Sequence, residues 1–206
     1  MAPDRPVPPL ASPRRRSVNT TRRAELIERV SDLLLAEGFT SLTVDDLARR
    51  LKCSKATLYS IASTKEQLVV AVTKRFFEQA TRQIEAETSG VGDPGEQISS
   101  YLKGIGAAMS RQSSAFYRDM VSYPPTADIY DVNSLAAAQR VRQLIDHGVQ
   151  TGRFRDMDAT FAGHLIALAI EGIQSGRLQA VSGLSAGQAY VELGEILLNG
   201  LGKHPS

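Results

Sequence analysis

The feature that most constrains the fold is the stretch of residues 43–62, which has the pattern of two short helices joined by a tight turn. Thr43 is followed three residues later by Asp46, the spacing of a capping box at a helix start. Apolar residues then recur every three or four positions, and Ser54 supplies a second helix N-cap. The second helix is short and polar on one side, with Leu58 and Ile61 forming its apolar stripe.

This helix-turn-helix pattern suits insertion of the second helix into the major groove of DNA. The charge distribution agrees with it: residues 1–75 hold fourteen Lys and Arg against eight Asp and Glu, whereas residues 76–206 hold ten against fourteen. The basic surplus therefore lies on the segment that carries the motif, as phosphate contact requires. A helical hairpin in an unrelated α-protein would share the local pattern. The flanking sequence is therefore needed to distinguish a DNA-binding motif from such a hairpin.

The flanks carry a family resemblance. Residues 36–43 read AEGFTSLT, and residues 47–68 continue with the motif and a TKEQL run that opens another helix. These runs resemble the DNA-binding domain of TetR-family transcriptional regulators over about fifty of the 206 residues. Three positions depart from the family pattern: Lys52 stands at the usual turn glycine, and Ala56 and Ala62 replace a glycine and a phenylalanine. Lys52 is expected to adopt a left-handed backbone at a cost of roughly 1 kcal/mol.

The resemblance implies which residues contact DNA. It places Thr43, Tyr59 and Lys65 on phosphates, and Lys55, Thr57 and Ser60 at base edges. Ala56 would offer an apolar contact to a thymine methyl group. The expected DNA-binding residues are Thr43, Ser54, Lys55, Ala56, Thr57, Tyr59, Ser60 and Lys65.

The first twenty residues hold five of the nine prolines and the run Arg14-Arg15-Arg16. Such a segment cannot bury enough apolar surface to order itself. It is either a flexible basic arm that reaches DNA or a solvated tail without contact. Cys53 is the only cysteine, which excludes an intrachain disulfide and a cysteine-cluster metal site, and its simplest interpretation is a small buried hydrophobe.

The periodicity predicts an all-α fold of about nine helices, with a flexible arm (1–20), a helix-turn-helix domain (21–68) and a larger helical ligand-binding and dimerisation domain (69–206). The later helices are expected near 133–150, 158–182 and 185–200, among others. The longest apolar run, residues 161–173, is interrupted by His164 and Glu171, so we expect no membrane span. Without a secretory signal pattern, the expected location is the cytoplasm.

The resemblance also implies a homodimer and a small-molecule pocket in the second half. The helices near 158–182 and 185–200 are apolar on two sides, as a four-helix bundle between subunits requires; a monomer that covers both faces internally is the alternative. The effector is expected to be apolar or aromatic. Ordinary core packing is the alternative for each pocket candidate, namely Tyr101, Met109, Phe116, Tyr117, Met120, Tyr123, His147 and His164.

The sequence thus predicts a ligand-responsive repressor that binds a palindromic operator as a homodimer. A non-specific architectural DNA-binding protein is the first alternative, and a helical enzyme is the second. The three histidines, His147, His164 and His204, lack metal-ligand spacing, and we find no nucleophile–base pattern. A formal G-x-G-x-x-G at residues 90–95 follows an expected helix, whereas a dinucleotide-binding fingerprint follows a strand. We therefore expect no cofactor. Together with the histidine spacing, this leaves no expected metal site and no expected catalytic residue.

Overall fold

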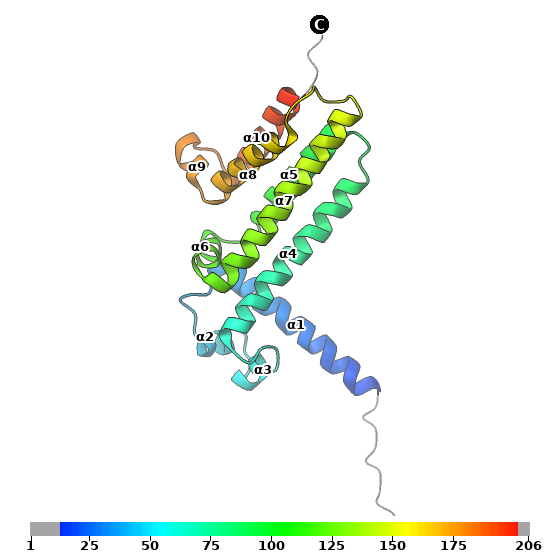
Figure 1. Ribbon diagram of the computed structural model, residues 1–206. Helices are drawn as coiled ribbons and strands as arrows, with labels where there is room; N and C mark the ends of the chain where they lie inside the picture. Colours follow the sequence, from blue (N-terminus) through cyan, green and yellow to red (C-terminus); the bar gives the residue numbers. More distant parts are fainter. Residues whose placement is uncertain (1–12, 202–206) are drawn as a thin grey trace, which may run out of the picture.

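The computed structural model describes residues 13–201, and within that range the chain forms ten helices and no strand (Figure 1). The all-α fold class is confirmed. No helix in this range has both the length and the hydropathy needed to cross a bilayer. The helices are α1 (Pro13–Glu37), α2 (Val44–Arg50), α3 (Lys55–Tyr59), α4 (Lys65–Ser89), α5 (Pro94–Met109), α6 (Ser114–Ser122), α7 (Pro124–Gln150), α8 (Ala159–Gln174), α9 (Arg177–Ser182) and α10 (Ala186–Leu201).

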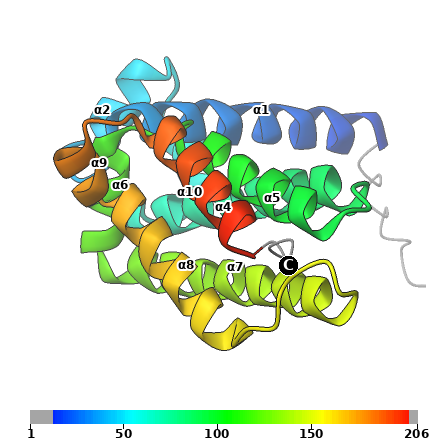
Figure 2. The ribbon, with the colours of Figure 1, turned by 90° about the horizontal axis from the view of Figure 1, so that it is seen from above.

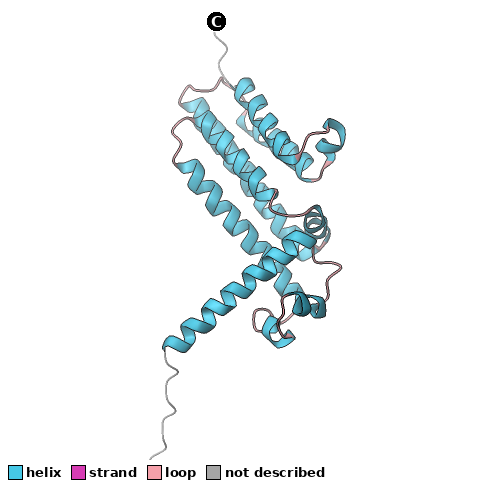
Figure 3. Ribbon diagram, turned by 180° about the vertical axis from the view of Figure 1, so that it is seen from behind, coloured by secondary structure: helices cyan, strands magenta, loops and turns pink. Residues whose placement is uncertain are grey.

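The molecule is elongated, with α2 and α3 at one end and the α7–α8 connection at the other (Figure 1). The long helices α4, α5 and α7 run side by side along it, and α1 crosses α4 near the α2–α3 end (Figure 3). Seen from above, α8 lies over α7 and α10 over α5, and the short α9 joins α8 to α10 at one end of the pair (Figure 2). The helix-turn-helix is therefore carried at one tip of a helical body.

Two apolar clusters hold these parts together. The first cluster contains residues of the four helices α1, α2, α3 and α4. It also includes Phe116 and Met120 from α6 and Tyr130 from α7. The second lies between α5, α7, α8 and α10, with Ile98 and Ile145 fully buried. The expected domain boundary at residue 68 falls inside α4, and the first cluster extends across it. The helix-turn-helix is thus packed directly on part of the second half of the chain.

The expected count of nine helices becomes ten because the helix expected over 158–182 is divided. Gly176 adopts a φ of +76°, a left-handed conformation that ends α8, and α9 follows at once. The helix expected from residue 133 begins at Pro124 instead. Proline is favoured at the first helical position because it lacks only an N–H that the helix would leave unpaired there.

The basic arm expected over 1–20 is shorter than predicted. The first helix, α1, begins at Pro13, within the range expected for the arm, so residues 13–20 are helical. Residues 1–12 lie outside the described part of the chain. DNA contact by these residues, or by the Arg14-Arg15-Arg16 run at the start of α1, stays a prediction.

Candidate nucleic-acid interface

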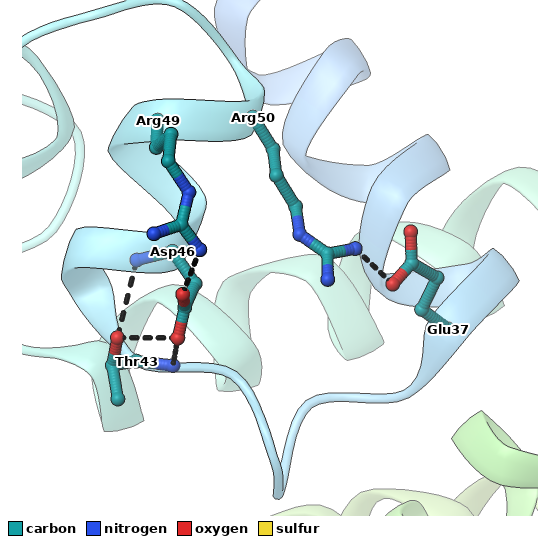
Figure 4. Close-up of polar contacts among 5 residues, drawn as sticks. All are labelled: Glu37, Thr43, Asp46, Arg49 and Arg50. Carbon is teal, nitrogen blue, oxygen red and sulfur yellow. Dashed lines mark hydrogen bonds and ion pairs between the residues drawn. The ribbon is translucent and has the colours of Figure 1, made fainter.

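The start of α2 is fixed by the predicted capping box (Figure 4). The Thr43 hydroxyl accepts a hydrogen bond from Asp46 N (3.1 Å) and donates one to Asp46 Oδ2 (2.6 Å), and Thr43 N donates to the same oxygen (3.0 Å). These hydrogen bonds, followed by the nearby Arg49 guanidinium, lower the pKa of the Asp46 carboxyl. The hydroxyl proton of Thr43 is committed to Asp46, so a phosphate contact by that hydroxyl would have to replace this bond.

The turn between α2 and α3 contains the departure expected from the sequence. Lys52 has a φ of +51°, and it is the one non-glycine residue with positive φ in the described part of the chain. A side chain with a Cβ is disfavoured there by roughly 1–2 kcal/mol. The neighbouring Cys53 is half-buried against the first cluster, close to the small hydrophobe that was expected.

Helix α3 presents a polar face to solvent. Ser54 caps it by accepting a hydrogen bond from Thr57 N (3.1 Å), as predicted, and Leu58 anchors it with only 2% of its surface exposed. Ile61 is half-buried behind it. The exposed side chains are those expected to contact DNA: Lys55, Ala56, Thr57, Tyr59 and Ser60.

Two contacts bring the starts of α2, α3 and α4 together. Lys55 Nζ lies 2.6 Å from Asp45 Oδ1 on α2, and Lys65 Nζ lies 3.5 Å from the carbonyl oxygen of Thr40. The eight sequence-predicted residues therefore lie at the starts of α2 and α4 and along α3 with its two caps. The hydrogen bond and charge of Asp45 raise the pKa of Lys55 above its ordinary value, so Lys55 stays protonated.

Arginines from α1 and α2 hold this unit in place, and no sequence motif had pointed to them. Arg29 donates to the carbonyl of Leu51 (2.5 Å) at the end of α2, and Arg23 donates to Ile61 (3.1 Å) just beyond α3. Arg50 pairs with Glu37 at the end of α1 (Figure 4). Carbonyls at helix C-termini lack partners in their own helix, so these bonds position both helices.

A cavity of about 1280 Å³ lies in the second half of the chain, bounded by α4, α5, α6, α7 and α8. Four of the eight sequence-predicted pocket residues line it: Tyr101, Met109, Tyr117 and His164. His164 is exposed there, so the alternative of a core histidine does not hold. Charged residues that no pattern had indicated also line this cavity, among them Glu85 and Arg140.

The other four pocket candidates do not line this cavity. Phe116 and Met120 are fully buried in the first cluster, where they pack beneath the helix-turn-helix. Tyr123 is half-buried against the same cluster, and His147 is exposed near the far end of α7. The structure does not bring these four residues to the cavity, because sequence gives the apolar face of a helix but not which neighbour covers it.

The short helix α6 contributes to the cavity wall and also contacts α1, which packs against the helix-turn-helix. Tyr117 and Val121 line the cavity. At the start of α6, Ser113 N donates a hydrogen bond to the carbonyl of Leu35 in α1 (2.8 Å). A ligand that displaced α6 would therefore also strain or break its hydrogen bond to the end of α1.

The comparisons agree with this arrangement. Residues 26–72 match the family model of bacterial regulatory proteins of the tetR family. No curated protein matches the chain. Among solved structures, similar ones include a candidate transcriptional regulator from Saccharomonospora viridis in complex with choline, with a TM-score of 0.75 at 19% identity over 90% of this chain and 100% of that one.

Two further solved structures share the fold. A TetR transcription regulator from Haloarcula marismortui has a TM-score of 0.74 at 18% identity, covering 89% of this chain and 100% of that one. A transcriptional regulator of the TetR/AcrR family from Thermobifida fusca has a TM-score of 0.67 at 24% identity, covering 87% and 98%. Residues 26–72 thus match the tetR family of bacterial regulatory proteins, and the chain shares the fold of solved structures of TetR-family transcriptional regulators.

Proposed function

We propose that this regulator is a repressor that binds a two-fold symmetric operator as a homodimer and releases it when a small molecule occupies the cavity. The observation that carries the DNA-reading part is the polar, exposed face of α3, with Leu58 buried behind it. Lys55 and Thr57 are assigned to base edges, and Tyr59 and Lys65 to phosphates.

Selection of bound fragments from random DNA tests the specificity. A sequence-specific dimer enriches one short palindrome and gives a footprint confined to it. Salt-sensitive binding to any duplex, without enrichment, would instead favour the architectural alternative. Substituting Lys55 or Thr57 should change which sequence is enriched, and an unchanged preference after both substitutions would remove these residues from base contact.

The homodimer is supported by apolar side chains left exposed on α8 and α10. Phe161, Leu165 and Leu168 form a stripe on α8, with 69%, 54% and 64% of their surfaces exposed. On α10, Val191 and Ile196 are also exposed. Exposed apolar side chains that cluster on two adjacent helices are typical of interfaces between subunits.

Light scattering at micromolar concentration tests the dimer, which should have twice the mass of the chain. Leu165→Glu places a charge in the stripe and should give a monomer. Val132→Glu is the matched control, because Val132 is also exposed, at 68%, but lies on α7, beside α4 instead of α10. A monomeric wild-type mass, or dissociation by both substitutions alike, would contradict this interface.

The ligand response is supported by the cavity and by the contacts of α6 with both the cavity and α1. One structural relative holds choline, which shows a small molecule bound by that protein. In this chain we expect a cavity ligand to raise the melting temperature and weaken operator binding, with a coupling of about 1–3 kcal/mol. A ligand that stabilises the protein but leaves operator affinity unchanged would argue against this switch.

A further inference from the structure

The cavity walls also constrain the chemistry of the effector. Building on the proposed effector site, we propose that it takes a neutral ligand with an apolar body and one hydrogen-bond acceptor, such as a carbonyl oxygen, bound by the Tyr101 hydroxyl. Three observations carry this inference: the apolar lining, the pairing of the charged groups around it, and the position of Tyr101.

The walls near α4 and α5 are mainly apolar. They are formed by Phe77, Ile84, Ile105 and Met109, with Ile170 contributed by α8. Such a lining favours an apolar body through the area it removes from water. It offers no compensation to a charged group on the ligand, because desolvating an ion costs several kcal/mol unless it is paired.

The charged groups that line the cavity are balanced, and some of them neutralise each other in two ion pairs. Arg140 donates from Nε and a terminal nitrogen to the two carboxylate oxygens of Glu85, at 3.0 and 3.1 Å. Glu171 pairs with Arg177 at 2.9 Å. The full set of charged lining residues holds three carboxylates against three guanidinium groups: Glu85, Asp131, Glu171, Arg118, Arg140 and Arg177. Neither an anion nor a cation therefore finds a surplus of opposite charge.

Tyr101 supplies the polar contact. Its side chain lines the cavity with only 7% of the residue exposed, and its hydroxyl has no hydrogen-bond partner among the described residues. Burial, followed by the charge of Glu85, raises the pKa of Tyr101 to about 12, so the hydroxyl keeps its proton. The hydroxyl of Tyr130, by contrast, already donates to Gln174. A hydroxyl that lines the cavity and has no protein partner among the described residues can donate to an acceptor on the ligand.

Four naphthalene probes that differ in one substituent test the inference: 2-acetylnaphthalene, 2-ethylnaphthalene, 2-naphthoate and 2-naphthylmethylammonium. Each displaces the neutral fluorophore N-phenyl-1-naphthylamine, and the absence of tryptophan from the chain keeps the background low. We expect the ketone to bind at least fivefold tighter than the hydrocarbon, and both ions to bind more weakly than either. Tyr101→Phe should abolish the advantage of the ketone and leave the hydrocarbon unchanged.

Two charge-neutralising variants provide an independent test. Glu85→Gln leaves Arg140 without its carboxylate, so 2-naphthoate should gain at least tenfold in affinity. Arg140→Gln leaves Glu85 unpaired, so the ammonium probe should gain instead. Because the two variants make opposite predictions, either one that remains folded is informative.

The inference is overturned if an ion binds the wild-type protein best, if Tyr101→Phe weakens ketone and hydrocarbon equally, or if no probe displaces the fluorophore. Operator binding is measured on the same preparations with the DNA selected above. Failure of the proposed repressor function would appear as loss of specific DNA binding, whatever the ranking of the probes. A wrong ligand class would instead change the ranking and leave operator binding intact.

Discussion

Asp119 on α6 holds the backbone of Phe39 at the corner between α1 and α2. Its Oδ2 accepts hydrogen bonds from Phe39 N at 2.6 Å and from Thr40 N at 2.8 Å. The preceding Gly38 has a φ of +80°, and a Cβ there would lie 2.6 Å from the same oxygen. A residue eighty positions away therefore fixes the chain just before the helix-turn-helix, from a helix whose other side lines the cavity.

Asp119→Ala should loosen this corner. Two backbone donors lose a charged acceptor, and hydrogen bonds to charged groups contribute about 1.5–3 kcal/mol each when shielded from water. We expect hydrogen exchange at the amides of Phe39 and Thr40 to accelerate tenfold or more, with weaker operator binding. Asp128→Ala, which removes an exposed carboxylate from α7, is the matched control. Unchanged exchange at both amides would exclude the proposed route from the cavity to DNA.

Replacing Lys52 by glycine should stabilise the protein. Glycine removes the strain at a φ of +51° but adds freedom to the unfolded chain, so the net gain in unfolding free energy is about 0.5–1 kcal/mol. Chemical denaturation measures it. Lys52→Ala keeps the Cβ and should give no such gain; equal gains from both variants would point to the lysine side chain instead of the backbone.

The sequence predicted the helix-turn-helix well because its signals are local. Thr43 with Asp46, and Ser54 with the buried Leu58, act over one helical turn, and the structure confirms both caps and the anchor. The prolines after Tyr123 follow the end of α6, and the first of them also starts α7. Proline stops a preceding helix and favours a following one, so its presence alone does not give the length of the loop.

The cavity could be predicted only in part because its walls depend on tertiary packing. Tyr117 and Phe116 are adjacent on α6, yet Tyr117 lines the cavity and Phe116 is buried beneath the helix-turn-helix. The pair of Glu85 and Arg140 joins residues 55 positions apart, and no spacing rule connects them. Asp119 on α6 binds the backbone of Phe39 and Thr40, about eighty positions earlier, and no local sequence pattern links residues so far apart.

Asp45→Asn should strengthen DNA binding. In the free protein the carboxylate of Asp45 holds Lys55, and this ion pair has to open before Lys55 can reach a base edge. Removing the carboxylate also removes a negative charge beside the phosphates, so we expect a gain in operator affinity of roughly three- to tenfold. Asp32→Asn makes the same charge change on the exposed face of α1. A comparable gain there would mean that net charge, not release of Lys55, accounts for the effect.

The stability of the protein should fall in acid partly through Asp93, the N-cap of α5. Its Oδ1 accepts hydrogen bonds from Gly95 N (2.9 Å) and Glu96 N (3.1 Å), and its Oδ2 lies 2.7 Å from Arg153 Nε. The bond from Glu96 N, with the Arg153 pair adding to it, holds the pKa of Asp93 below its ordinary value of 3.8. A lowered pKa stabilises the folded state above the pKa of the unfolded chain, and that contribution is lost as the pH falls below about 4.

Asp93→Asn keeps an N-cap oxygen but cannot titrate, so it isolates the charge. We expect the variant to be less stable than the wild type at pH 6 and to approach it near pH 2, as measured by urea denaturation across that range. Asp156→Asn controls for the loss of one carboxylate, because Asp156 is exposed in the loop before α8. If the stability difference between wild type and Asp93→Asn were the same at pH 6 and pH 2, the charge of Asp93 would contribute nothing, since a titrating carboxylate must lose its advantage once both states are protonated.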